Sequence, residues 1–146
     1  MIKGVKIISQ KEKGLSQIAR DLIEEVKELG APYVIALYGD LGSGKTTLTQ
    51  YMAKELGINH PVVSPTFIIE KIYKIKETPF SHLVHIDAYR LEGEKELSSI
   101  GWDEILKNKE NLIVVEWADR IEKALPENTL RVELSFVDHD EREIAW

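Results

Sequence analysis

The chain has 146 residues, of which 43% are hydrophobic, so it is long enough for one domain with a sizeable core and too short for two of ordinary size. Its formal net charge of −6 argues against a large nucleic-acid-binding surface, and the absence of Cys excludes disulfides, thiolate zinc sites and cysteine nucleophiles. No apolar run approaches the roughly 18 residues of a membrane-spanning helix. We therefore expect a soluble, cytoplasmic protein without a membrane partner, with residues 1–146 in a single domain.

The first third of the sequence predicts a helix and then a buried strand. Ser9 and Glu12 have the spacing of a capping box, in which two side chains satisfy the first amide groups of a helix. The next segment, Tyr33–Leu37, is a short apolar run without alternation, which is typical of a central strand covered on both faces. Before it, apolar residues recur at helical spacing up to Gly30; they are Leu15, Ile18, Ala19, Leu22, Ile23, Val26 and Leu29.

Strands and helices alternate along most of the remaining chain. A second helix is predicted from Lys45 to Leu56, where Gly57 ends it, and strands are predicted near residues 67–74, 83–87 and 112–116. Alternating residues at 130–136, followed by 142–146 after a short polar link, predict a terminal antiparallel hairpin. This pattern indicates an α/β fold with three layers, a mixed sheet that is parallel near its centre, and a C-terminal antiparallel hairpin.

The strongest chemical signal lies between the predicted central strand and the second helix. From Gly39 to Thr46 the sequence reads Gly-Asp-Leu-Gly-Ser-Gly-Lys-Thr, which is the pattern of a phosphate-binding loop in its required strand-to-helix setting. Its glycines let backbone N–H groups surround an anion, Lys45 adds charge for the β- and γ-phosphates, and the Thr46 hydroxyl suits Mg²⁺. A P-loop NTPase-like domain that binds ATP with Mg²⁺ is therefore predicted. The residues predicted to contact the nucleotide in this loop are Gly39, Asp40, Leu41, Gly42, Ser43, Gly44, Lys45, Thr46 and Thr47.

Two predicted strands end in an acidic residue. Asp87 follows an apolar run at residues 83–86, and Glu116 follows one at 112–115. Ligands of parallel sheets bind at the carboxyl ends of the strands, so both carboxylates could face the γ-phosphate. One would hold the metal, directly or through water, and the other would orient the attacking water. An acidic residue at a strand end is more often only a solvated terminus, so position alone leaves these roles open.

Two other features favour structural interpretations. His82, His85 and Asp87 lie close in sequence, but on a strand His85 and Asp87 share a face that His82 does not, which argues against a metal site made by all three. Tryptophans are more often core or interface residues than platforms for stacking bases. Trp117 is the exception of interest, because it directly follows Glu116.

Four motifs in order resemble the TsaE (YjeE) family of bacterial ATPases, and the resemblance covers nearly the whole chain. They begin at Tyr38 (Tyr-Gly-Asp-Leu-Gly-Ser-Gly-Lys-Thr-Thr), Val63 (Val-Ser-Pro-Thr-Phe), His85 (His-Ile-Asp-Ala-Tyr-Arg-Leu) and Glu116 (Glu-Trp). Four linked motifs are much more specific than a phosphate loop alone. The family supports the formation of threonylcarbamoyladenosine beside the anticodon of tRNAs that read codons beginning with A.

The resemblance implies roles for the matching residues. Lys45 would contact phosphates, Thr46 and Glu116 would lie at Mg²⁺, and Asp87 would be the other essential acid and a second candidate metal ligand. Thr66, in a Ser-Pro-Thr segment that would respond to the γ-phosphate like a switch loop, is a further catalytic candidate. Arg142 in the terminal hairpin matches a position that approaches the nucleotide in the family.

The family also implies partners. Its members resemble weak ATPases that are activated on joining the complex of TsaD and TsaB, the tRNA threonylcarbamoyl transferase, and ATP turnover would reset that complex between cycles. The net charge of −6 agrees with a subunit that meets tRNA only indirectly.

Three alternative functions come from other classes. A GTPase would normally carry Asn-Lys-x-Asp, and the nearest string, Asn108-Lys-Glu-Asn111, lacks the final Asp. A small phosphotransferase would usually need a substrate-binding insert and an arginine-rich lid, and the chain has few arginines. A conformational latch that binds ATP without significant turnover is the hardest alternative to exclude.

Overall fold

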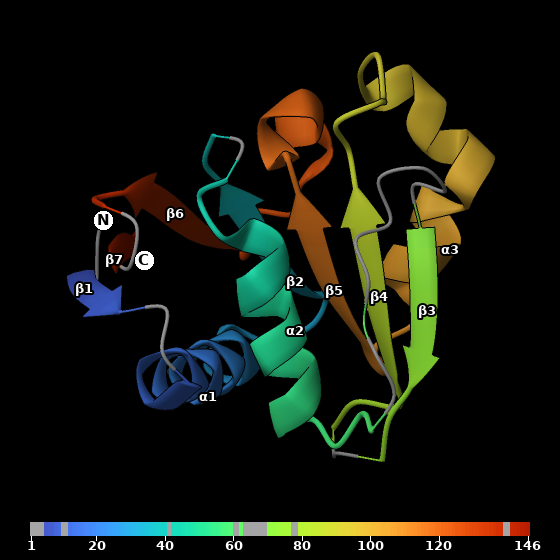
Figure 1. The fold of residues 1–146 in the computed structure, drawn as a ribbon. Coiled ribbons are helices and arrows are strands. Elements are labelled where there is room, and N and C mark those ends of the chain that lie inside the picture. Colours follow the sequence, from blue (N-terminus) through green and yellow to red (C-terminus); the bar gives the residue numbers. More distant parts are fainter. Residues whose placement is uncertain are drawn as a thin grey trace.

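A computed structural model of the chain shows a seven-stranded mixed sheet with helices on both faces (Figure 1). It describes residues 5–9, 12–40, 42–59, 62, 70–76, 79–138 and 141–146, and the side chains from residue 14 onward within these ranges. The strands are β1 (Val5–Ser9), β2 (Tyr33–Tyr38), β3 (Glu70–Lys74), β4 (His82–Asp87), β5 (Asn111–Glu116), β6 (Leu130–Phe136) and β7 (Glu141–Ala145). The helices are α1 (Glu12–Leu29), α2 (Lys45–Glu55) and α3 (Trp102–Lys107), with 3₁₀ helices η1 (Glu94–Ile100) and η2 (Ala118–Ala124).

The centre of the sheet is parallel, as the sequence predicts. The strand order is β1-β7-β6-β2-β5-β4-β3, and the pairs β6–β2, β2–β5 and β5–β4 are all parallel. Residues Val34 to Leu37 of β2 have no exposed surface, and every residue of β5 is buried. The unbroken apolar runs in these strands therefore correspond to strands covered on both faces.

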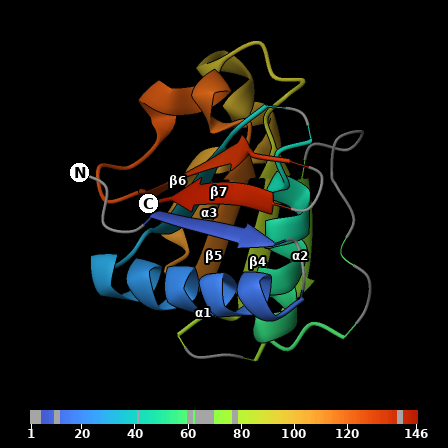
Figure 2. The ribbon, with the colours of Figure 1, turned by 60° about the vertical axis from the view of Figure 1, so that its left-hand side comes forward.

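The outer strands are antiparallel. β7 pairs with β6, which confirms the predicted terminal hairpin, and β3 pairs with β4 at the other edge. β1 pairs with β7, and Figure 2 shows β1, β7 and β6 side by side above α1. The predicted strand at residues 67–74 is described only from Glu70, and residues 67–69 lie outside the described part of the chain.

The predicted capping box at the start of the first helix is wrong. Ser9 is the last residue of β1 and pairs with Glu141 of β7, so its backbone is extended and belongs to the sheet. Helix α1 begins at Glu12, three residues beyond Ser9. The pattern fails here because pairing with a strand at the far end of the sequence overrides a local capping preference.

Two helical layers enclose the sheet, which confirms the three-layer architecture. α1 and α2 lie on one face, where the apolar stripe of α1 is buried; it comprises Leu15, Ile18, Ala19, Leu22, Ile23 and Val26. The sequence patterns do not predict η1, α3 or η2, which are too short to show a clear helical period. They cover the other face of the central strands with Leu97, Trp102, Ile105 and Ile121.

The carboxyl ends of β2, β4 and β5 lie together at the same end of the central strands, which is the upper end in Figure 1. In the strand register Asp87 of β4 is the partner of Glu116 of β5, and Glu116 is also the partner of Leu37 of β2. The two acidic strand ends predicted from the sequence are therefore neighbours, next to the strand that leads into the phosphate-binding motif.

Candidate functional site

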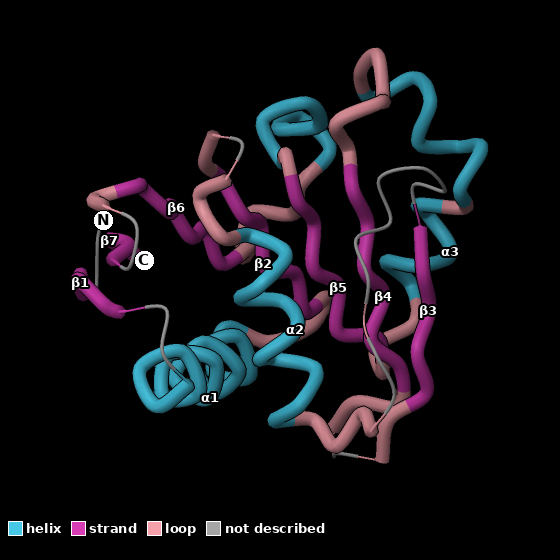
Figure 3. The backbone as a smooth tube through the Cα atoms, in the orientation of Figure 1, coloured by secondary structure: helices cyan, strands magenta, loops and turns pink. Residues whose placement is uncertain are grey.

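The segment from Gly39 to Gly44 joins the end of β2 to the start of α2 (Figure 3), and Lys45 and Thr46 of the motif lie in the first turn of the helix. The φ angles of Gly39, Gly42 and Gly44 are 151°, 80° and 100°, a region that side chains strongly disfavour. The amide of Leu48 donates to the carbonyl oxygen of Gly44 at 2.9 Å, so the helix begins directly at the end of the loop. The glycine-rich backbone of the loop and the N-terminus of α2 therefore lie next to each other. Such an arrangement is suited to binding an anion.

Gly39 is the loop position with the least space. A Cβ atom at this residue would lie 2.5 Å from Ser43 Oγ and 2.6 Å from the carbonyl oxygen of Leu134, and the latter belongs to the backbone of β6. Only glycine therefore lets the loop approach β6 this closely.

We expect Gly39→Ala to lower the free energy of unfolding by about 2–6 kcal/mol, because backbone strain and overpacking each cost about 1–3 kcal/mol. Gly57→Ala is the matched control, since Gly57 also has positive φ (86°) but no atom within 4 Å of the added Cβ, and it should cost only about 1–2 kcal/mol. Urea denaturation of both variants measures the difference. Equal losses would show that the contact with β6 is unimportant.

Lys45 lies inside the loop that precedes it. Its Nζ donates to the carbonyl oxygens of Gly39 at 2.5 Å and Asp40 at 3.0 Å, and lies 3.4 Å from Ser43 Oγ. The same ammonium is 4.1 Å from the centre of the Trp117 ring, within the range of a cation–π interaction. The side chain is thus enclosed by loop carbonyls on one side and an aromatic ring on another.

The electrostatic setting of Lys45 suits an anionic ligand. Burial lowers the pKa of the ammonium, and the carboxylates of Glu116, Asp87, Asp40 and Asp119 act against that shift. A buried ammonium keeps its charge at an energetic cost, which an anion placed beside it would offset.

Glu116 connects the loop to the neighbouring strands. Its Oε1 accepts a hydrogen bond from the Thr46 hydroxyl at 2.8 Å, and its Oε2 lies 2.5 Å from Nε2 of His85. Glu116 is 3% exposed and His85 is completely buried. The structure thus brings together two residues predicted for the metal site and adds His85, which the sequence analysis did not select.

Asp87 lies one strand away and has a different set of contacts. It is 2% exposed, and its Oδ1 accepts a hydrogen bond at 2.9 Å from the backbone amide of Tyr89. That bond is typical of an aspartate that stabilises the turn after a strand. One carboxylate oxygen of Asp87 therefore stabilises the chain that leaves β4.

The oxygen atoms of Thr46 and Glu116 fit Mg²⁺. They are hard oxygen ligands and lie 2.8 Å apart at the N-terminus of α2. Mg²⁺ usually takes only one or two protein ligands and completes its shell with phosphate oxygens and water. Within the described ranges no group of three or more His, Cys, Asp or Glu residues could hold a metal ion.

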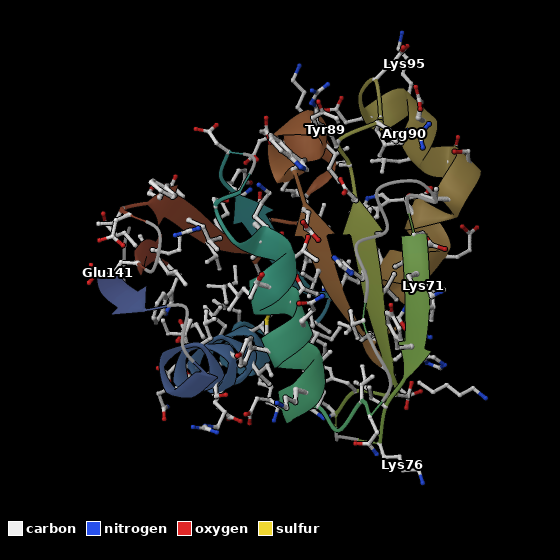
Figure 4. All side chains as sticks on the ribbon, in the orientation of Figure 1. Lys71, Lys76, Tyr89, Arg90, Lys95 and Glu141 are labelled. Atoms are coloured by element: carbon white, nitrogen blue, oxygen red, sulfur yellow. The ribbon has the colours of Figure 1, made fainter. Side chains whose placement is uncertain are left out.

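Arg142 brings the terminal hairpin to the phosphate-binding loop. Its Nη2 donates to the carbonyl oxygen of Gly42 at 3.2 Å, and its Nη1 donates to the carbonyl oxygens of Asp138 and Glu141. The guanidinium also lies 4.6 Å from the centre of the Phe136 ring. The hairpin therefore reaches the loop through one largely buried arginine of β7, the strand that begins at Glu141, which is labelled in Figure 4.

Trp117 contacts the loop region through Lys45. Its φ of 56° makes it the one non-glycine residue with positive φ among those described, and such strained residues often occur at functional sites. The turn at Trp117 leads from β5 into η2 and places the indole over Lys45. The ring of Tyr89 lies 5.0 Å from Trp117, and Figure 4 shows Tyr89 and Arg90 at the same end of the sheet. Two aromatic residues thus border the site.

Several predicted site residues remain untested by the geometry. Leu41 and Thr66, the latter with its Ser-Pro-Thr segment, lie outside the described residues. Thr47 is half-buried in the first turn of α2.

The sequence holds only a partial signal for His85. It lies two residues before Asp87 and therefore on the same face of β4. If β4 and β5 are parallel neighbours, that face is shared with Glu116. His82, in contrast, contacts Ser81, with 3.0 Å between its Nδ1 and the serine hydroxyl.

None of the helices described has the length and apolar character needed to span a membrane.

Comparisons with known proteins agree on one family. The model of the family described as "Threonylcarbamoyl adenosine biosynthesis protein TsaE" matches residues 9–144. The chain is 43% identical over 113 residues to a protein of Bacillus subtilis named tRNA threonylcarbamoyladenosine biosynthesis protein TsaE, covering 77% of this chain and 68% of that protein. It is 39% identical over 120 residues to the protein of the same name from Nostoc sp., covering 79% and 70%.

A solved structure supports the same relationship. The crystal structure of YdiB from Bacillus subtilis superposes on this chain with a TM-score of 0.67 at 31% sequence identity. The superposition covers 99% of this chain and 85% of that protein. The likeness therefore extends over the whole sheet, including the antiparallel edge formed by β1, β7 and β6.

Proposed function

This chain belongs to the TsaE family of threonylcarbamoyladenosine biosynthesis proteins, and we propose that it is a Mg²⁺-dependent ATPase acting as a single domain of residues 1–146. The observation that carries the proposal is the contact between Thr46 and Glu116, with 2.8 Å between their oxygens, beside the loop that encloses Lys45. Oxygen ligands for Mg²⁺ next to a phosphate-binding loop are recurring parts of sites that transfer the γ-phosphoryl group of a nucleotide.

The contacts suggest a division of roles. Lys45 and the loop amides would hold the phosphates, and Thr46 and Glu116 would hold Mg²⁺, which when bound neutralises charge on the phosphate oxygens. Asp87, whose strand partner is Glu116, would then orient the attacking water from the neighbouring strand. Thr66 remains a proposed catalytic residue.

Arg142 is proposed as an additional nucleotide-binding residue. Its contact with the carbonyl oxygen of Gly42 places a positive charge beside the middle of the phosphate-binding loop. The hairpin that carries it is joined to the sheet through β6, so the position of the guanidinium is supported by the fold.

The proposed partners are the TsaD and TsaB proteins of the transferase complex. A net charge of −6 leaves little basic surface for direct contact with tRNA, so the protein would act on tRNA modification through these partners. ATP turnover would reset the complex between cycles of threonylcarbamoyl transfer.

A latch that binds ATP without turnover is the second candidate. It is favoured by the contacts of Lys45 with the loop's own carbonyl oxygens and of Glu116 with Thr46 and His85. Groups that already have protein partners must exchange them before they act on a ligand, and this favours slow turnover in the isolated protein.

The test is ATP hydrolysis by the protein alone and with its cognate TsaB–TsaD pair, measured as phosphate release with Mg²⁺ and with EDTA. We expect slow release alone, a strong rise with the partners, and none in EDTA. Bound ATP without release under either condition would favour the latch. Release that is unaffected by EDTA would contradict the proposed role of Mg²⁺.

A further inference from the structure

His85 is a completely buried polar residue whose contact is with the proposed metal site. It lies in β4 on the face that carries Leu83 and Asp87, with its Nε2 2.5 Å from Oε2 of Glu116. Its strand partner on β5 is Val114, and Leu83 and Val114 are both buried apolar residues. An apolar residue at position 85 would therefore suit the packing of this layer.

The hydrogen bond fixes the arrangement of protons on the ring. An ionised carboxylate only accepts hydrogen bonds, so Nε2 of His85 carries the hydrogen and donates it to Glu116. Nδ1 is buried and has no hydrogen-bond partner among the described residues. A buried polar atom without a partner costs about 1–3 kcal/mol, and a residue needed only for packing would not incur that cost.

The two oxygens of Glu116 are held by different donors. Thr46 from the start of α2 donates to Oε1, and His85 from β4 donates to Oε2. Because the ring of His85 is fully enclosed in the sheet layer, it cannot follow a rotation of the carboxylate. The bond to His85 therefore holds Oε1 toward Thr46.

We propose that His85 is a positioning residue that holds the Glu116 carboxylate with Oε1 facing Thr46 and thereby sets the affinity of the site for Mg²⁺ in the nucleotide complex. This inference rests on the proposed function, since it takes Thr46 and Glu116 as the metal-binding pair. Groups that orient metal ligands in this way typically contribute 10- to 100-fold to metal affinity.

The test compares three substitutions by calorimetry of ATP binding in Mg²⁺ and in EDTA. His85→Leu removes the donor, His85→Gln places an amide N–H close to the position of Nε2, and His85→Asn carries a similar amide that is too short to reach Glu116. We expect the ratio of the dissociation constants in EDTA and in Mg²⁺ to fall about 10- to 100-fold in the Leu and Asn variants and to stay close to wild type in the Gln variant. The affinity in EDTA should be unchanged in all three.

The outcomes separate this inference from the proposed function. A wild-type protein that binds ATP equally well with and without Mg²⁺ would contradict the proposed metal site itself. A clear Mg²⁺ dependence in the wild type that is retained in both His85→Leu and His85→Asn would overturn only the role of His85. If the Leu variant does not fold, the comparison of Gln with Asn decides, because both keep a polar amide in the layer and differ in reach.

Discussion

Replacing Glu116 by Gln is expected to lower partner-stimulated ATP turnover by a factor on the order of 10² or more, because the substitution removes the charge that faces the metal and the transferring phosphate. The glutamine amide keeps the shape of the site: its oxygen can accept from His85 and its nitrogen can donate to the Thr46 hydroxyl. The loss of ATP turnover should therefore arise from the missing charge and not from a rearrangement of the side chains around residue 116. Phosphate release in the presence of the TsaB–TsaD pair measures it.

Glu110→Gln is the matched control for this experiment. Glu110 is exposed and immediately precedes β5, at the opposite end of the strand from Glu116. Its substitution removes the same charge from the protein and should leave turnover at the wild-type rate. If Glu116→Gln also hydrolyses ATP at the wild-type rate, Glu116 is not part of the catalytic site.

The central part of the fold could be predicted because its signals are local. The four central residues of Tyr33–Tyr38 are buried, and an apolar run without alternation is typical of a strand covered on both faces, so its composition indicates a central strand. β1 could not be predicted in this way. Val5–Ser9 is short, lies at an edge, and is a strand because it pairs with β7 at the other end of the sequence. The erroneous capping role of Ser9 follows from the same long-range pairing.

The candidate site shows the same division between local and long-range information. The loop motif and the acidic strand ends are contiguous in sequence, and the structure places Lys45, Thr46 and Glu116 within one group of contacts. The contact of His85 depends on the register of β4 against β5, which a single sequence does not reveal. The position of Trp117 over Lys45 depends on a left-handed backbone conformation that its residue type disfavours.

Replacing Lys45 by Ala is expected to weaken ATP binding roughly 100-fold or more in dissociation constant. The ammonium would donate charge-assisted hydrogen bonds to the β- and γ-phosphates, and each bond of that kind contributes about 1.5–3 kcal/mol. Two such bonds amount to about 3 kcal/mol or more, which corresponds to that change in affinity. Isothermal titration calorimetry with ATP measures the effect directly.

The fold should tolerate this substitution. Burial lowers the pKa of Lys45, so holding the charged ammonium at this site carries an energetic cost that offsets part of what its hydrogen bonds to Gly39 and Asp40 contribute. Lys54→Ala is the matched control, since Lys54 is an exposed lysine in the last turn of the same helix. The Lys54→Ala variant should bind ATP with the affinity of the wild type. Unchanged affinity in a folded Lys45→Ala variant would mean that the loop does not hold phosphates through this residue. A loss confined to Lys45 would support the proposed role of its ammonium, which contacts the carbonyl oxygens of Gly39 and Asp40 in this structure, in holding the phosphates of ATP.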